Sequence, residues 1–371
     1  GGKGLLIQLS HHIDVTNNEI HHFPGGGFRV TQSDFVNFTK NKVHHNTSRA
    51  SVGTHGVVAE GLSAQSGDNS ATRKLTISEN LIYSNYNEIY SWVQSKTIVT
   101  TAIDEGKGLA LLRTSPTMSN FNGIIRVENN IAYDNGKSGI HTNDVDNAEI
   151  INNTVYNNGH TNIYNADISA GPSAGISIQS SNNIKIINNI SVVKSGLNPP
   201  LQALSEGQNC TGKTVSNNII FGVTTSDFAG GYTIADPLFI DMNNNNVRLQ
   251  STSPAIDNAL ANVAPTTDFY GNSRTTPDIG AVEYISSSLN TNENLKNTEK
   301  FSVFPNPTKD GEIHVLHSEK EGNLYIYNTL GQFIKEIKLK ANETKINISD
   351  LENGIYLLKK GNQVVKIIKS N

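Results

Sequence analysis

Residues 125–133 read Ile-Arg-Val-Glu-Asn-Asn-Ile-Ala-Tyr, and residues 148–156 read Ala-Glu-Ile-Ile-Asn-Asn-Thr-Val-Tyr. The second stretch repeats the pattern of the first after 23 residues. In both stretches, apolar residues stand five and three positions before the second Asn, and the residues between them are polar. Alternation with a period of two predicts a strand with one buried face.

The same unit recurs through most of the chain. Its Asn marks seven units, separated by 23, 39, 50, 23, 36 and 29 residues, so we interpret 23 residues as the basic turn and the excess as inserted loops. The seven residues are Asn18, Asn41, Asn80, Asn130, Asn153, Asn189 and Asn218.

A second strand in each unit begins after a Gly, as at Gly108 and Gly139. A unit this short cannot bury its own apolar face, so successive units are expected to stack about 4.8 Å apart. The sequence therefore predicts an all-β fold, a right-handed parallel β-helix with turns of about 23 residues. The repeated Asn side chains are expected to hydrogen-bond to one another along the inside of a corner.

Composition excludes several other classes of protein. Hydrophobic residues make up 36% of the chain and charged residues 17%, and the excess of Asn, Ser, Thr and Gly gives little helical propensity. A net charge of -4 argues against nucleic acid as a partner, and no apolar run reaches the roughly 18 residues of a membrane span. The single cysteine, Cys210, supplies no intrachain disulfide. The chain is long enough for its own core, so we expect a monomer.

The last third of the chain departs from the repeat. We assign residues 1–284 to the β-helix, with capping turns from about residue 236, and residues 285–300 to a polar linker. Residues 301–371 alternate between apolar and polar positions and predict a small antiparallel β-sandwich. Because the chain enters the repeat directly at Gly4, an N-terminal portion is expected to be missing.

Several segments of this last part carry a resemblance to a known family. They are Phe304-Pro305-Asn306-Pro307, Tyr327-Asn328-Thr329-Leu330-Gly331, Leu351-Glu352-Asn353-Gly354-Ile355-Tyr356 and a Lys-rich final strand. Together they resemble the C-terminal sorting domain of the type IX secretion system of Bacteroidetes. The resemblance implies handling by that machinery and a protein that is secreted or held on the outer-membrane surface of a Gram-negative bacterium.

Charged and imidazole side chains gather at outward positions beside the Gly-initiated strand. Because the turns stack, positions far apart in the sequence are expected to lie a few strand spacings from one another. Inserted loops at about 86–105 and 159–173 are expected to flank them and to contribute the aromatic residues Tyr90 and Trp92. The outward candidates are Arg29, His55, Glu60, Lys107, Lys137, His141 and Asn143.

The repeat region resembles the parallel β-helix polysaccharide lyases. The segments Pro24-Gly25-Gly26-Gly27, Asp104-Glu105-Gly106-Lys107-Gly108 and Gly136-Lys137-Ser138-Gly139-Ile140-His141 resemble an alginate-lyase-like subgroup. The resemblance implies β-elimination from a uronic acid of an anionic polysaccharide, a reaction that needs a neutralised C6 carboxylate, a base for the C5 proton and an acid for the leaving O4.

The candidate residues can be matched to these three needs. Lys107 is the expected base, because nearby cations favour its neutral form, and Tyr90 or His141 is the expected acid. Arg29 and His55 are expected to neutralise the carboxylate. The expected substrate-binding residues are His55, Glu60, Trp92, Lys137 and Asn143.

Calcium is the alternative means of neutralising the carboxylate. Glu60, Asn143 and Asp144 could supply oxygen ligands, although the sequence has no strong calcium motif and requires no cofactor.

Two other functions stay open. A glycoside hydrolase would need two paired carboxylates, for which Asp104, Glu105, Glu60 and Asp167 are available. A glycan-binding protein or adhesin would use the same surface without chemistry.

Overall fold

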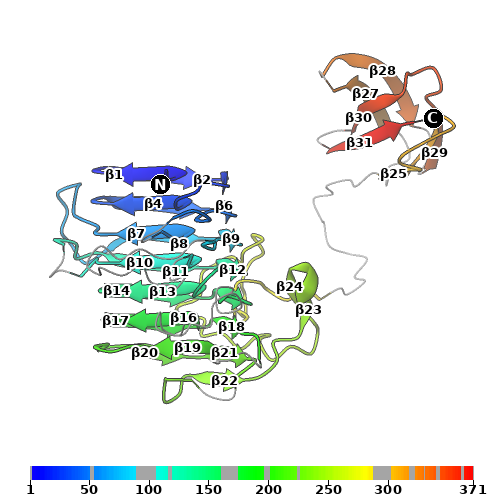
Figure 1. Ribbon diagram of the computed structural model, residues 1–371. Helices are drawn as coiled ribbons and strands as arrows, with labels where there is room; N and C mark the ends of the chain where they lie inside the picture. The colour runs from blue at the N-terminus through cyan, green and yellow to red at the C-terminus, as the bar shows by residue number, and fades with distance from the viewer. Residues whose placement is uncertain are drawn as a thin grey trace. The chain divides into compact units, whose positions relative to one another are not determined.

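In the computed structural model, three parallel β-sheets form the sides of a solenoid, each coil of which adds one strand to each sheet (Figure 1). The sequence repeat is thus one coil, and the predicted parallel β-helix is confirmed. The structure describes residues 2–50, 54–88, 106–115, 119–159, 174–195, 201–223, 226–286, 302–316, 322–329, 331–339, 343–360 and 363–370.

The sheets are numbered here in the order in which a coil visits them. Sheet 1 contains β1 (Leu5–Gln8), β4 (Phe28–Thr31), β7 (Val57–Glu60), β10 (Leu109–Leu112), β13 (Ile140–Asn143), β16 (Ala174–Gln179) and β19 (Gln202–Glu206). Sheet 2 contains β2 (His11–Thr16), β5 (Asp34–Thr39), β8 (Arg73–Ser78), β11 (Ile124–Glu128), β14 (Asp146–Ile151), β17 (Asn182–Ile187) and β20 (Thr214–Ser216). Sheet 3 contains β3 (Glu19–His21), β6 (Lys42–His44), β9 (Leu81–Tyr83), β12 (Ile131–Tyr133), β15 (Thr154–Tyr156), β18 (Ile190–Val192), β21 (Asn218–Phe221) and β22 (Tyr232–Ile234).

Each corner between sheets 2 and 3 is built from two consecutive residues. The first has a positive φ of 51–58°, a conformation that Asn tolerates better than most residues, and it is Asn in five of the seven coils. The second is the repeated Asn of the sequence. Asn130 donates from Nδ2 to Asn153 Oδ1 at 3.0 Å and to Ile77 O at 2.8 Å, while its own Oδ1 accepts from Asn80. The predicted ladder runs unbroken from Asn18 to Asn218.

A second amide ladder, which the sequence analysis missed, lies at the corner between sheets 3 and 1. It is formed by Asn46, Asn85, Asn135 and Asn158, which are linked from Nδ2 to Oδ1 at 2.9–3.0 Å. Each stands five positions after an Asn of the first ladder. The ladder and the backbone of the next coil together explain the Gly at this position, because a Cβ at Gly108 would stand 2.7 Å from both the Asn135 amide nitrogen and the Gly139 carbonyl oxygen.

The inside of the solenoid is apolar. Alternate residues of all three sheets form one continuous core, in which residues such as Phe28, Leu109 and Ile140 have no exposed surface. At the end of the solenoid that carries β22, Phe228 joins this core. No helix among the described residues has the length and hydrophobicity needed to cross a membrane.

Residues 236–284 pack along the outer face of sheet 3, where they form β23 (Phe239–Asp241), a 3₁₀ turn η2 (Met242–Asn244) and β24 (Asn246–Leu249). Their apolar side chains cover outward residues of the sheet, including Tyr133 and Tyr156. The corner amides bind them, since Asn152 Nδ2 donates to Asp278 O at 2.9 Å. These residues therefore cover apolar surface on the side of the solenoid.

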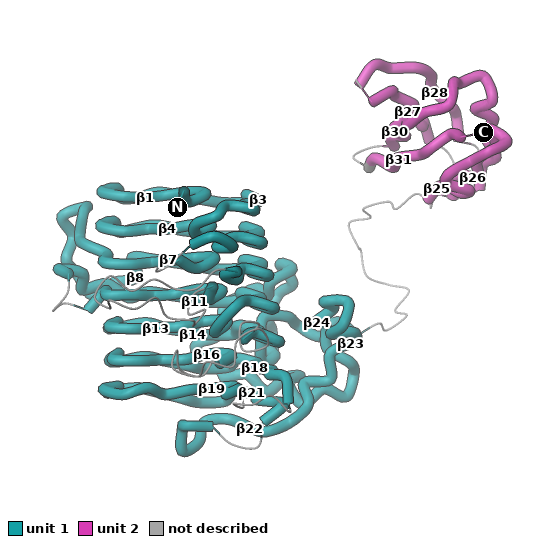
Figure 2. The backbone as a smooth tube through the Cα atoms, in the orientation of Figure 1, with its two compact units in different colours: residues 1–286 teal, residues 287–371 magenta. Residues whose placement is uncertain are grey.

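The chain divides into two compact units, residues 1–286 and 287–371 (Figure 2). In the second unit, two antiparallel sheets enclose a small core that includes Ile313, Leu324 and Leu358. One sheet contains β25 (Ser302–Phe304), β26 (Glu312–Leu316) and β29 (Glu343–Asn347). The other contains β27 (Gly322–Asn328), β28 (Phe333–Leu339), β30 (Gly354–Lys360) and β31 (Gln363–Lys369), so the predicted antiparallel sandwich is confirmed.

The two ladders predict a specific cost for losing one amide. We expect Asn130→Ala and Asn135→Ala each to lower the free energy of unfolding by about 1–3 kcal/mol, because each leaves buried partners unsatisfied. Urea unfolding monitored by circular dichroism measures the change. Asn120→Ala is the matched control, because Asn120 is exposed. A ladder variant that unfolds at the same urea concentration as the control would contradict the structural role of the amides.

Candidate functional site

The outward face of sheet 1 carries most of the candidate residues. Strand pairing aligns Arg29, Val58, Ala110, His141 and Ser177 in one column across β4, β7, β10, β13 and β16. At a strand spacing of about 4.8 Å, Arg29 and His141 are roughly 14 Å apart along the solenoid. A second outward column contains Thr31, Glu60, Leu112 and Asn143. The predicted stacking of these positions is therefore correct.

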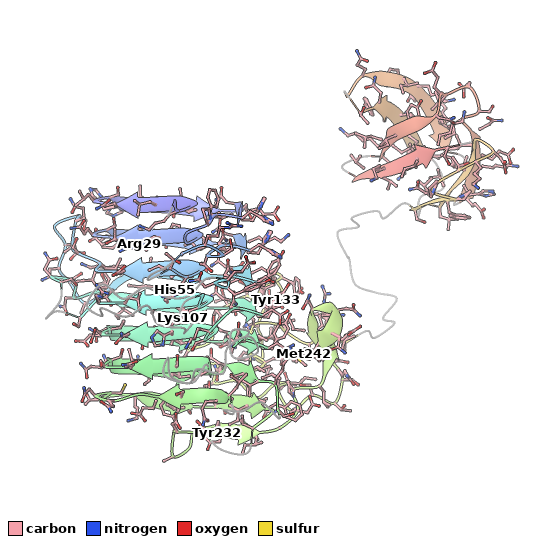
Figure 3. The ribbon with its side chains drawn as sticks, viewed as in Figure 1. Arg29, His55, Lys107, Tyr133, Tyr232 and Met242 are labelled. Carbon is pink, nitrogen blue, oxygen red and sulfur yellow. The ribbon has the colours of Figure 1, made fainter. Side chains whose placement is uncertain are left out.

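His55 and Lys107 stand just before the glycines of neighbouring coils and are in direct contact. The backbone N–H of Lys107 donates to His55 Nδ1 at 3.3 Å, which makes that nitrogen an acceptor. Figure 3 shows Arg29, His55 and Lys107 following one another along the solenoid. Burial, together with the positive charges of Lys107 and Arg29, holds the pKa of His55 well below its usual range, so His55 is neutral at pH 7.

Glu60 is held between two arginines. Its carboxylate forms an ion pair with Arg29, and its other oxygen lies 3.4 Å from Arg113 Nη1. A carboxylate whose two oxygens both face guanidinium groups does not fit a calcium ligand. In the described part of the chain, no group of three His, Cys, Asp or Glu side chains is arranged to hold a metal ion.

One donor of the Arg29 guanidinium has no hydrogen-bond partner among the described residues. The Nη2 of Arg29 contacts Glu60, whereas this donor is the buried Nε–H. An unpaired buried donor is costly. The described ion pairs of this face do not include Lys107, so its ammonium group faces no carboxylate that the structure describes. Positive charge on this face therefore exceeds what Glu60 neutralises.

His141 is the second imidazole of this face. Its Nδ1 lies 2.8 Å from Ser177 Oγ, which in turn donates to Ser138 Oγ at 2.9 Å. Burial, Lys107 and Lys137 hold the pKa of His141 well below its usual range. Lys137 is buried in the segment that precedes β13. Asn143 follows His141 by two positions on β13 and is partly buried.

The structure thus brings together Arg29 with Glu60, His55 with Lys107, and His141 with the charges of Lys107 and Lys137. Tyr90 and Trp92 lie outside the described residues, as do the carboxylates Asp104, Glu105 and Asp167. Sequence reasoning did not single out Arg113, Ser138 and Ser177 as site residues. The periodicity places all three on this face, but their partners depend on side-chain conformation.

The pairing of carboxylates that a glycoside hydrolase needs is not found in the two outward columns of sheet 1, where Glu60 is the one carboxylate.

A cleft of about 680 Å³ on the outer face of sheet 2 is also charged. There Arg126 pairs with Glu128 at 2.6 Å and with Glu149 at 3.0 Å, and Lys185 pairs with Glu149 at 2.9 Å. Its charges neutralise one another, so this cleft is a weaker candidate for an anionic ligand.

Comparison with known proteins gives three findings. Residues 302–370 match the model of the secretion system C-terminal sorting domain, which marks proteins exported by the type IX system, so this protein is secreted or attached to the cell surface. Over 67 residues the chain is 32% identical to beta-agarase A of Zobellia galactanivorans. The matched segment covers 18% of this chain and only 12% of that protein. The crystal structure of pectate lyase Pel9A is similar with a TM-score of 0.35 and 16% identity, over 74% of this chain and 73% of that one.

The neutral buried imidazole of His55 predicts acid sensitivity. An unfolded His has a pKa near 6.5, so below about pH 6.5 the unfolded chain binds a proton that the folded chain excludes. Stability is therefore complete above that pH and falls as pH decreases, by up to about 1.4 kcal/mol per pH unit for each such group.

We expect His55→Gln to make the free energy of unfolding less dependent on pH between 7 and 5, measured by urea unfolding at each pH. The exposed His11 provides the control variant His11→Gln, which should keep the dependence of the parent protein. The same pH dependence in the His55 variant would show that the imidazole is not held neutral.

Proposed function

We propose that this protein is a secreted polysaccharide lyase that cleaves a uronic-acid-containing glycan by β-elimination, of the alginate-lyase-like kind suggested by the local motifs. The observation that carries the proposal is the excess of positive over negative charge among the described residues on the outward face of sheet 1. Arg29 has a buried donor without a described partner, Lys107 faces no described carboxylate, and Glu60 is already paired. An anionic sugar would supply the missing acceptors.

The chemistry of β-elimination matches the residue types of this face. Removal of the C5 proton places negative charge on the C6 carboxylate, and fixed cationic donors stabilise that charge most in a partly desolvated site. Arg29, with His55 beside it, is proposed to hold the carboxylate. Asn143 and Lys137 are proposed to bind neighbouring parts of the chain, and Glu60 is proposed to orient the Arg29 guanidinium.

Lys107 and His141 are the proposed groups at the reacting carbon. They come from neighbouring coils, since β10 pairs with β13, so a single sugar unit could contact both. One of the two nitrogens must accept the C5 proton, and the other then stands beside the developing charge. The sequence alone favours Lys107 as the acceptor. Tyr90 remains the proposed acid and Trp92 a proposed stacking residue, both outside the described residues.

The location of the protein supports a polymeric substrate. A type IX sorting domain places the first unit outside the cytoplasm, where polysaccharides are met as intact chains. A row of outward side chains along stacked coils can contact several sugar units of one chain. We propose residues 1–284 as the enzyme, 285–300 as a linker and 301–371 as the sorting domain, with the anionic polysaccharide bound by a monomer.

Lys107→Ala tests the proposal directly. The intact protein is expected to raise the ultraviolet absorbance of the 4,5-unsaturated uronate on alginate, pectate or a glycosaminoglycan, and the variant is expected to lose at least a hundredfold in rate. Lys194→Ala is the matched control, because Lys194 is exposed and follows β18 of sheet 3.

The same assay separates the alternatives. We expect the activity to survive the addition of a chelator, because both carboxylate oxygens of Glu60 already face arginines. New reducing ends without absorbance would identify a hydrolase. Binding without either product would identify a glycan-binding protein, and full activity of the Lys107 variant would remove Lys107 from the site.

A further inference from the structure

The hydrogen bonds of His141 determine which of its nitrogens carries the proton. Ser138 Oγ accepts from the backbone N–H of Ala174 at 3.4 Å and from the Ser177 hydroxyl at 2.9 Å. The Ser177 proton is therefore committed to Ser138. Ser177 Oγ then has only lone pairs to offer His141, 2.8 Å away, so the proton between them belongs to His141 Nδ1.

The other nitrogen of His141 is consequently an acceptor. A neutral imidazole has one N–H, so when Nδ1 carries it, Nε2 has a lone pair. No described residue hydrogen-bonds to this Nε2. A neutral imidazole whose Nε2 lone pair is not engaged by a described residue can accept a proton there.

We propose that His141 Nε2 is the atom that accepts the C5 proton, and that Ser177 and Ser138 are positioning residues that hold His141 in the Nδ1–H tautomer. This inference rests on the proposed lyase function and reverses the roles expected from the sequence. Lys107 becomes the cation beside the developing charge, and His141 becomes the base rather than the acid.

The step balances without a cofactor. The C5–H bond breaks and its proton forms a bond to Nε2, the electron pair forms the C4=C5 double bond, and the C4–O4 bond breaks. The departing O4 takes a proton from the proposed acid, Tyr90, which regains one from solvent, and the imidazolium returns one to solvent. A bound C6 carboxylate also strengthens the base, because an anion close to His141 offsets the cations that disfavour its protonation.

The tautomer can be measured without reference to activity. Nitrogen-15 NMR of the full chain labelled at histidine, with His141 assigned by comparison with His141→Gln, distinguishes a protonated Nδ1 from a protonated Nε2. We expect a protonated Nδ1 and an unprotonated Nε2 at neutral pH. A protonated Nε2 would overturn the inference, even in a protein that proves to be a lyase.

Kinetics of the serine variants test the positioning role. Ser177→Ala is expected to lose the fixed tautomer in the NMR spectrum and to lower kcat at least tenfold with little change in KM, while Ser177→Thr, which keeps the hydroxyl, restores both. Ser205→Ala is the matched control, because Ser205 is the next residue in the same column, on β19.

The outcomes separate this inference from the proposed function. Lyase activity with unchanged kcat and tautomer in Ser177→Ala would overturn the positioning role alone. Absence of unsaturated products from every uronate polymer would overturn the proton-accepting role together with the lyase, and a protonated Nδ1 would then support only the tautomer. Circular dichroism of each variant confirms that it folds.

Discussion

The side-chain amides stacked inside two corners of the solenoid are the interaction on which the other features depend. Each Asn satisfies the backbone of adjacent coils and the amide of the next Asn, so a coil can be added only in the register that continues both ladders. A buried amide that lost this register would leave donors and acceptors unpaired, at a cost of about 1–3 kcal/mol each. The ladders thus fix register at the corners, while the apolar core between them supplies most of the burial.

Fixed register turns sequence periodicity into columns of side chains. His55 and Lys107 are 52 residues apart in the chain, yet a hydrogen bond joins them because they hold the same position in neighbouring coils. Insertions of very different length leave this register unchanged, since they leave the solenoid between strands. A site on such a face can therefore gain or lose flanking loops without moving its strand-borne residues.

The sequence predicts the features that follow from the repeat pattern, and it does not predict those that depend on side-chain contacts between coils. Strand alternation, the Asn18 to Asn218 ladder and the outward columns follow from periodicity alone, and the structure confirms them. The second ladder was missed because the sequence analysis attributed the repeat at this corner to the Gly alone. In the structure that Gly leaves space for the side chains of Asn46 and its equivalents. The pairing of Glu60 with two arginines and the tautomer of His141 could not be predicted, because each depends on side-chain conformations on different coils. The packing of residues 236–284 on sheet 3 likewise depends on contacts more than a hundred residues apart in the chain.

The charge arrangement on sheet 1 is costly for folding and suited to binding an anion. Several cations stand near two imidazoles that must remain neutral, and one Arg29 donor is buried without a described partner. Like charges held close together would ordinarily move apart, but residues on hydrogen-bonded strands cannot do so independently. The rigidity of the ladders therefore keeps the cations close together before a ligand arrives, and a preorganised site spends little energy on reorganisation when charge develops. The stability of the corners and the electrostatics of the outward face are therefore linked. The cations of this face could not stay close together on a scaffold without stable corners.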